Sequence, residues 1–227
     1  MSIPAQHIDL GLIAYTEAWQ LQHELVGRRL RGEVSDLLLT CEHPDVITVG
    51  RRQEARSSIL EARFPVVEVE RGGGATYHGP GQLVGYPILL LGEQERDLHR
   101  YLRRLEEGLI ALCGRCGVPA SRRTGLTGVW TADGQRKLAS LGVAVRRWVT
   151  FHGFALNVTT DLGRFAALTP CGLDARVMTS LAGEGGRLQG RTPTVADLLQ
   201  PAAECLGAAL GRTFAPGALE SLVGGSS

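Results

Sequence analysis

Apolar and polar positions follow two periodicities along the chain, and no repeat or low-complexity segment separates them. Apolar residues three or four positions apart predict helices over residues 16–30, 97–116 and 195–210, with a short one over 161–168. Because strand and helix patterns are mixed rather than strictly alternating, we expect one α+β domain over residues 1–227, with a mixed β-sheet flanked by helices. Short apolar runs bounded by turn residues predict the strands, over residues 8–13, 36–41, 46–49, 65–70, 83–91, 128–131, 136–145 and 149–158.

The composition is ordinary for a soluble globular protein, with 44% apolar and 21% charged residues. The longest purely aliphatic run, residues 88–91, is far too short to cross a membrane. No basic segment followed by an apolar run begins the chain, so we expect no secretory signal and a cytoplasmic location. The net charge of +1 provides no global field that would attract nucleic acid.

One basic residue differs from all the others. The chain has 24 basic residues, and every one is an arginine except Lys137. A bias toward arginine across the whole composition explains the pattern in general, and chance survival of one lysine is the simplest alternative. However, arginine is not deprotonated in proteins, whereas lysine can be. Lys137 is therefore a candidate for a task that requires a titratable amine.

The five cysteines are an odd number in a chain of this size, which favours reduced thiols over a disulfide framework. Cys171 differs from the rest because it lies in a Thr-Pro-Cys-Gly loop, where an attacking thiol would be accessible. The C-x-x-C pair at the end of a predicted helix has no second pair of ligands, so no zinc site is expected. Four cysteines are predicted to be small buried hydrophobic residues: Cys41, Cys113, Cys116 and Cys205.

Residues 71–82, RGGGATYHGPGQ, form a glycine-rich segment that we interpret as a loop close to a ligand. No phosphate-binding motif is completed here, and a strand rather than a helix follows the loop. The alternative is a wide hairpin connection without a ligand. The segment identifies a candidate site but no reaction.

Lys137 beside Cys171 would provide a physical mechanism. An ammonium about 4 Å from a thiol, at an effective dielectric near 20, favours the thiolate by up to about 4 kcal/mol. That corresponds to roughly three pKa units at most. The lysine could then take the thiol proton, pass it to a departing thiol and accept one from an attacking amine. The sequence does not show that the two residues touch.

The chain contains, in this order, the segments EHPDVITVGR (42–51), RGGGATYHGPGQ (71–82), GVW…RKLASLG (128–142), FHGFALNV (151–158), DLGRF (161–165) and TPCG (169–172). Their order and spacing resemble the motifs of one family, the lipoyl(octanoyl) transferases. The resemblance covers about residues 37–181, and it implies a single α+β domain like that of the biotin- and lipoate-protein ligases. It also implies transfer of octanoyl from octanoyl-acyl carrier protein to a lysine of a lipoyl domain, the first step of endogenous lipoate biosynthesis.

The resemblance also implies roles for individual residues. Cys171 would carry the acyl thioester and Lys137 would tune it. His43, Tyr86 and His152 match further polar positions, for which a structural hydrogen bond and a catalytic role are both open. The segments that line the acyl pocket in the family correspond to Arg71, Gly72, Gly73, Gly74, Ala75, Thr76, Tyr77, His78, Ser140, Leu141, Gly142, Gly153, Phe154 and Ala155.

The expected partners are octanoyl-acyl carrier protein as donor and the lipoyl domains of 2-oxoacid dehydrogenase complexes and the glycine cleavage H protein as acceptors. No metal or organic cofactor is expected, because an amide forms downhill from a thioester. One alternative is a lipoate- or biotin-protein ligase that forms an adenylate, from which Cys171 distinguishes the present chain. The other is a non-catalytic module that binds acidic partners through its arginine pairs, and such a module would not need Cys171.

Overall fold

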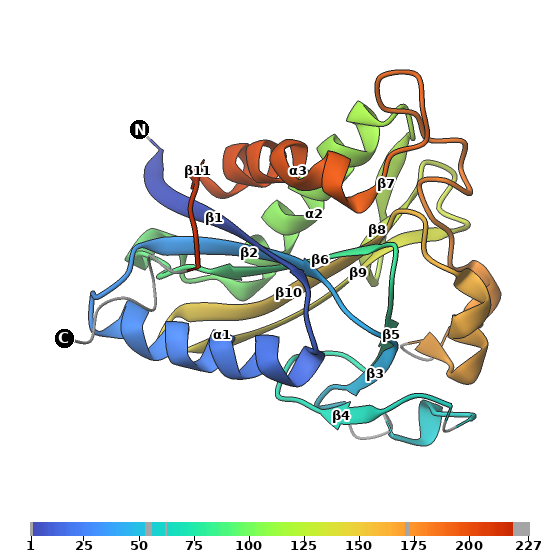
Figure 1. The fold of residues 1–227 in the computed structure, drawn as a ribbon, viewed down its shortest axis with the longest axis horizontal. Coiled ribbons are helices and arrows are strands. Elements are labelled where there is room, and N and C mark those ends of the chain that lie inside the picture. The colour runs from blue at the N-terminus through green and yellow to red at the C-terminus, as the bar shows by residue number, and fades with distance from the viewer. Residues whose placement is uncertain (1, 53–55, 62, 171–172, 220–227) are drawn as a thin grey trace.

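A mixed sheet of eight strands forms the centre of the computed structural model, which describes residues 2–52, 56–61, 63–170 and 173–219 (Figure 1). The two central strands are buried along their whole length, which explains their nearly continuous apolar sequence. β1 pairs in parallel with both of its neighbours, and the other pairings are antiparallel. In spatial order the strands are β11 (Arg212–Pro216), β1 (Ile3–Leu12), β2 (Asp36–Glu42), β6 (Gln82–Ile88), β10 (Val149–Asn157), β9 (Lys137–Arg146), β8 (Leu126–Thr131) and β7 (Ala120–Arg123).

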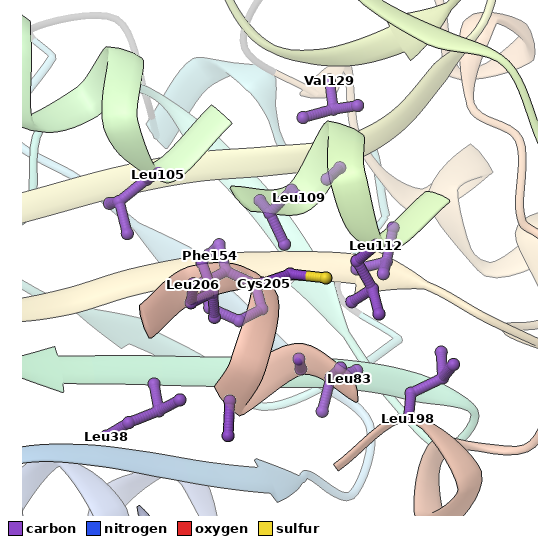
Figure 2. Packing of buried hydrophobic residues seen from close by; sticks show 14 of the residues in the cluster. Leu38, Leu83, Leu105, Leu109, Leu112, Val129, Phe154, Leu198, Cys205 and Leu206 are labelled. Carbon is purple, nitrogen blue, oxygen red and sulfur yellow. The ribbon is translucent and has the colours of Figure 1, made fainter. Parts of the chain in front are cut away.

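Helices cover both faces of this sheet (Figure 1). α1 (Tyr15–Leu30) lies on one face, while α2 (Leu98–Arg115) and α3 (Val195–Leu210) pack together on the other. Figure 2 shows how leucines of α2 and α3 meet those of the sheet. α3 starts with a capping box between Thr194 and Asp197.

A second, small sheet lies beside the large one and contains β4 (Val66–Glu68), β3 (Val46–Val49) and β5 (Ala75–His78) in that order. Short 3₁₀ segments cover its apolar side, among them η3 (Leu162–Ala167) and η5 (Ala175–Val177). Two further 3₁₀ segments are η1 (Arg56–Ser58) and η2 (Glu93–Glu95).

The three long predicted helices and the main apolar strands are confirmed within two residues at most ends. Three strands were not predicted: β5, β7 and β11. β5 lies inside the glycine-rich segment, so the interpretation of residues 71–82 as a continuous loop was wrong. The predicted helix over 161–168 is a 3₁₀ segment, and β1 begins five residues earlier than predicted.

The cysteines and the helices of the described chain bear on two further expectations from the sequence. The four cysteines predicted to be buried are all buried and unpaired. Among the described helices, none combines the length and the apolar character that crossing a membrane requires.

Candidate functional site

Two adjoining cavities lie along β9 and share Leu141 and Gly142 in their walls. The larger, which we call the Lys137 cavity, has a volume of about 330 Å³. The smaller, which we call the His152 cavity, has a volume of about 30 Å³. The Lys137 cavity is also lined by Arg52, Gly72, Gly73, Gly74, Leu98, Leu102, Gly125, Leu126, Thr127, Lys137, Val143 and Leu173. The His152 cavity is also lined by Tyr15, Arg71, Thr76, His78, Val84, Tyr86, Ser140, His152, Gly153, Phe154 and Ala155.

Lys137 is the first residue of β9 and is only 4% exposed. Its ammonium lies 5.6 Å from the centre of the Trp130 ring. Its carbonyl accepts the backbone N–H of Thr179 at 2.9 Å, which fixes the chain after η5 against the start of β9. The one lysine of the sequence is therefore a buried group in the wall of a cavity.

Cys171 lies outside the described residues, as does Gly172, so its predicted contact with Lys137 stays a prediction. Leu173, two positions further along the chain, lines the Lys137 cavity. The chain that follows the Thr-Pro-Cys-Gly segment therefore returns to the cavity that contains the lysine.

The glycines of residues 72–74 lie close to the backbone of β9. Gly72 donates its N–H to the carbonyl of Val143 at 3.0 Å. A Cβ on Gly142 would lie 2.9 Å from the Gly72 carbonyl oxygen, which is closer than real side chains approach. Glycine at position 142 thus permits the contact that brings the glycine-rich segment to the cavity.

The predicted pocket residues of β5 divide between two sides of the strand, because successive side chains of a strand point to opposite faces. Thr76 and His78 line the His152 cavity. Ala75 and Tyr77 pack instead in the apolar cluster beneath the small sheet. The Tyr77 hydroxyl donates to Asp45 at 2.6 Å, away from both cavities.

The central strands shape the His152 cavity through paired small and large residues. Gly85 of β6 faces Phe154 of β10, and a Cβ on Gly85 would lie 2.2 Å from the phenyl ring. Gly153 likewise approaches the Gly85 carbonyl, where a Cβ would lie 2.1 Å away. A side chain at position 85 would overlap the Phe154 ring, and one at position 153 would overlap the backbone of β6.

A chain of hydrogen bonds starts at the buried side chain of Arg71. Its Nη2 donates to both the carbonyl and the hydroxyl oxygen of Thr48, each at 2.8 Å. The Thr48 hydroxyl lies 3.2 Å from Nε2 of His78, whose Nδ1 lies 2.8 Å from Oε1 of Gln82. Burial holds the pKa of His78 well below its usual value, so the ring is neutral. Its Nε2 therefore accepts a hydrogen bond from the Thr48 hydroxyl.

The same chain continues to the lysine. The amide of Gln82 donates to Oδ1 of Asn157 at 2.9 Å. The amide of Asn157 donates to the carbonyl of Thr179 at 2.9 Å, and Thr179 donates its own N–H to the carbonyl of Lys137. Buried polar groups thus connect Arg71, in one cavity wall, to the backbone of Lys137 in the other.

His43 and Tyr86 form a second polar pair, on the α1 side of the sheet. His43 Nδ1 lies 2.7 Å from the carbonyl of Ile13, which only accepts, so Nδ1 carries the proton. His43 Nε2 therefore accepts the hydroxyl of Tyr86 at 2.6 Å. Burial lowers the pKa of His43 to about 4. Tyr86 lines the His152 cavity directly, whereas His43 supports it from behind.

His152 has an unusual conformation for a residue with a side chain. Its φ is 54°, in the left-handed region, and its residue is only 1% exposed. Its backbone N–H donates to Oε1 of Gln22 at 2.8 Å, which ties α1 to β10. Burial lowers the pKa of the ring to about 4, and a Glu70 oxygen 3.6 Å from Nε2 only partly opposes this. The ring is neutral near pH 7.

Several residues behind the cavity walls, which contact lining residues or one another, were not identified as site residues from the sequence. Gln82 and Asn157 lie in recognised motifs, but nothing in the sequence indicated that they bond to each other. Trp130, beside Lys137, lies in the Gly-Val-Trp segment and was read only as part of a strand. The described residues contain no group of three or more His, Cys, Asp or Glu side chains that could hold a metal ion.

Comparison with solved structures places the fold among the lipoate-protein ligases. A putative lipoate protein ligase from T. acidophilum, solved with bound lipoic acid, superposes with a TM-score of 0.74. The match covers 96% of this chain and 89% of the other at 15% sequence identity, so it describes the fold alone. The predicted biotin/lipoate-ligase-like α+β fold is confirmed.

Sequence comparison is more specific. The family model of the lipoyl protein ligase A/B catalytic domain matches residues 14–206. An octanoyltransferase of Geobacter metallireducens is 51% identical over 79% of this chain and 83% of its own length. The octanoyltransferase of Gloeobacter violaceus is 44% identical over 94% of both chains. The chain therefore belongs to the lipoyl protein ligase A/B catalytic-domain family and, within it, to the octanoyltransferases.

Proposed function

We propose that this chain, as a single acyltransferase domain, moves an octanoyl group from octanoyl-acyl carrier protein to a lysine amine of a lipoyl domain. Cys171 carries the acyl group as a thioester, and Lys137 is the proton carrier. The names of the relatives support octanoyl transfer. The observation that carries the mechanism is the burial of the one lysine in the wall of a 330 Å³ cavity that Leu173 also lines.

The first half of the reaction exchanges one thioester for another. The Cys171 thiolate, paired with the Lys137 ammonium, attacks the carbonyl carbon of the donor, and a new C–S bond forms as the donor C–S bond breaks. The departing thiolate takes its proton from Lys137, which becomes a neutral amine. Gly72 is excluded as an oxyanion donor because Val143 already accepts its N–H, so Gly73 and Gly74 are the candidates in that loop.

The second half forms the amide. The neutral amine of the acceptor lysine attacks the acyl-enzyme, its proton passes to Lys137, and the Cys171 thiolate departs. The starting ion pair is restored, and no ATP is consumed because a thioester is converted to an amide. The acyl chain lies along β9 and β10, between the two cavities. Lipoyl domains of 2-oxoacid dehydrogenase complexes and the glycine cleavage H protein are the acceptors to test.

Intact-mass analysis tests the proposal directly. We expect octanoyl-acyl carrier protein to add one octanoyl group to the wild-type chain and none to Cys171→Ala. Adding a lipoyl domain should remove the group from the enzyme and place it on one acceptor lysine. An acyl adduct on Cys171→Ala that remains competent for transfer would overturn the thioester.

A parallel assay separates transfer from ligation. One sample receives octanoate and ATP, and the other receives an octanoyl thioester without ATP. We expect octanoyl-lysine only in the second. Product in the first sample alone would instead identify an adenylate-forming ligase.

A further inference from the structure

The side chain of Lys137 lies against Trp130 of the neighbouring strand. The two residues are register partners across β8 and β9, and the lysine ammonium lies 5.6 Å from the centre of the indole ring. Trp130 is fully buried. At such a distance the negative face of an indole attracts a cation, and the attraction strengthens where water is excluded.

The backbone of β8 is shaped to let the lysine reach this ring. Gly128 has a φ of 139°, a conformation that side chains rarely adopt. A Cβ on Gly128 would lie 2.6 Å from Cε of Lys137 and 3.3 Å from its Nζ. The lysine therefore passes directly over the Gly128 backbone, and the register of β8 and β9 shifts just after it, between Val129 and Trp130. A buried Glu106 carboxylate fixes this backbone by accepting the Gly128 N–H at 3.0 Å.

The indole carries a cost that a phenyl ring would avoid. Its Nε1 is buried and has no hydrogen-bond acceptor among the described residues. A buried donor without an acceptor is unfavourable, whereas an indole face binds a cation more strongly than a phenyl face. The exposed Arg123 guanidinium also lies over this ring, 4.9 Å from its centre.

We propose that Trp130 is a positioning residue for Lys137, whose ring favours the ammonium over the free amine and holds it in the cavity wall. Burial alone disfavours a charged amine, so without the ring a larger fraction of Lys137 would be neutral before the thiol reacts. The consequence for catalysis rests on the proposed function of Lys137, but the effect on its charge does not.

The sequence makes this charge directly measurable. Because Lys137 is the only lysine, labelling with ¹³Cε-lysine gives one side-chain NMR signal from a tag-free protein. Its titration is followed in Cys171→Ala, so that thiol ionisation does not contribute. We expect the midpoint to fall by about one pH unit in Trp130→Leu and by less in Trp130→Phe.

Fluorinated tryptophan provides a test that does not leave a hole in the core. Fluorine withdraws electron density from the ring while it changes the ring volume little. The chain has three tryptophans, and all are replaced together with mono-, di- and trifluorotryptophan. We expect the Lys137 midpoint to fall with each added fluorine. Trp148→Leu is the matched control, because the Trp148 ring also lies beneath an arginine, 5.7 Å from Arg96, but in the turn between β9 and β10.

The outcomes separate this proposal from the transfer mechanism. A midpoint unchanged by fluorination and by Trp130→Leu would overturn the role of Trp130, whatever the activity. A shifted midpoint together with normal turnover of Lys137→Arg would support Trp130 and overturn the proton carrier. Equal shifts in Trp130→Leu and Trp148→Leu would show a general effect and would also overturn the proposal.

Discussion

The amine of Lys137 is almost completely shielded from water, because it lies between the Trp130 ring, the Gly128 backbone and the Lys137 cavity. A lysine in such a place changes its charge more readily than an arginine would. Two histidines at or behind the His152 cavity are also buried. Burial holds His43 and His152 neutral, with pKa values of about 4. They hydrogen-bond and shape the site without adding charge near pH 7.

We therefore expect Lys137→Arg to lower the rate of octanoyl transfer by about 100-fold or more. The guanidinium keeps the positive charge that stabilises a thiolate, but it cannot give up a proton to the departing thiol. Steady-state formation of octanoyl-lysine on a lipoyl domain measures the effect. Arg136→Lys is the control, since it adds a lysine one position away on an exposed side chain. Unchanged turnover of Lys137→Arg would contradict the proton-carrier role.

Gly128→Ala tests whether the side chain of Lys137 needs the space above the Gly128 backbone. The added methyl group would lie 2.6 Å from Lys137 Cε and 2.8 Å from the Ala139 carbonyl oxygen, in a backbone conformation that disfavours alanine. We expect a loss of about 2–4 kcal/mol in the free energy of unfolding and a large loss of transfer. Gly125 also has a positive φ, of 78° rather than 139°, and an added methyl group there would have no atom within 4 Å. Gly125→Ala should lose only about 1 kcal/mol in urea unfolding.

Most candidate residues could be identified from motifs, because a glycine-rich segment and a rare lysine are local signals. The hydrogen bonds between them could not. The bond from Gln82 to Asn157 joins residues 75 positions apart, and a sequence does not record which strands become neighbours. Ala75 and Tyr77 show a second limit, because both belong to the motif but neither lines either cavity. A motif names consecutive residues, but a strand turns every second side chain to the other face.

At the scale of elements, the pattern predicted the strands that bury both faces and failed at strands defined by pairing alone. β7 has the sequence ASRR, and two of its four residues are exposed. β11 has three exposed residues among its five and pairs with β1 alone, whose Ile3 is 209 positions from its register partner Arg212. β5 is hidden by the glycines before it. Edge strands of this kind carry little hydrophobic signal of their own.

β11 is held at its start by a buried ion pair, which provides a test. Arg212 donates to Asp36 at 3.0 Å and also contacts Glu95, and both Arg212 and Asp36 have side chains that are 1% exposed. Arg212→Met should cost about 3–5 kcal/mol in urea unfolding, because it leaves Asp36 buried with Arg29 as its remaining ion-pair partner among the described residues.

The double variant Arg212→Met with Asp36→Asn separates the pair from the packing. If the ion pair sets the cost, the double variant should lose clearly less than the sum of the two single variants. Strictly additive losses would show that the two residues stabilise the fold independently. Arg115→Met, whose exposed partner is Glu204, is the control and should change stability by less than about 1 kcal/mol.

At the scale of the whole molecule, the large sheet separates two apolar cores. The His152 cavity is lined by residues of both cores and of the small sheet. The core beneath α2 and α3 contains Phe154, and the core beneath α1 contains Ala155. Successive residues of β10 therefore support opposite layers while both line the His152 cavity. The site is thus fixed from both faces, so a change in either core is expected to reach it.

This arrangement should make the stability of the molecule depend on pH through His43. The residue joins the connection before α1, at Ile13, to Tyr86 of β6, and burial lowers its pKa from 6.5 to about 4. Between these values the unfolded chain binds a proton that the folded chain excludes. The contribution of His43 to the free energy of unfolding is therefore fully present above pH 6.5. It is lost as the pH falls toward 4, and the loss amounts to up to about 3 kcal/mol.

Urea unfolding at pH 7.0, 5.5 and 4.5 measures this dependence. His43→Gln should be less stable than the wild type at pH 7.0, because the hydrogen bond to Tyr86 is altered, yet should lose less stability on acidification. Part of the loss should persist, because His78 and His152 are also buried and neutral. The exposed His99→Gln should keep the wild-type slope. Glutamine does not titrate, so His43→Gln binds no proton at this position when the chain unfolds. If its free energy of unfolding fell with pH as steeply as that of the wild type, the acid sensitivity would arise from other residues.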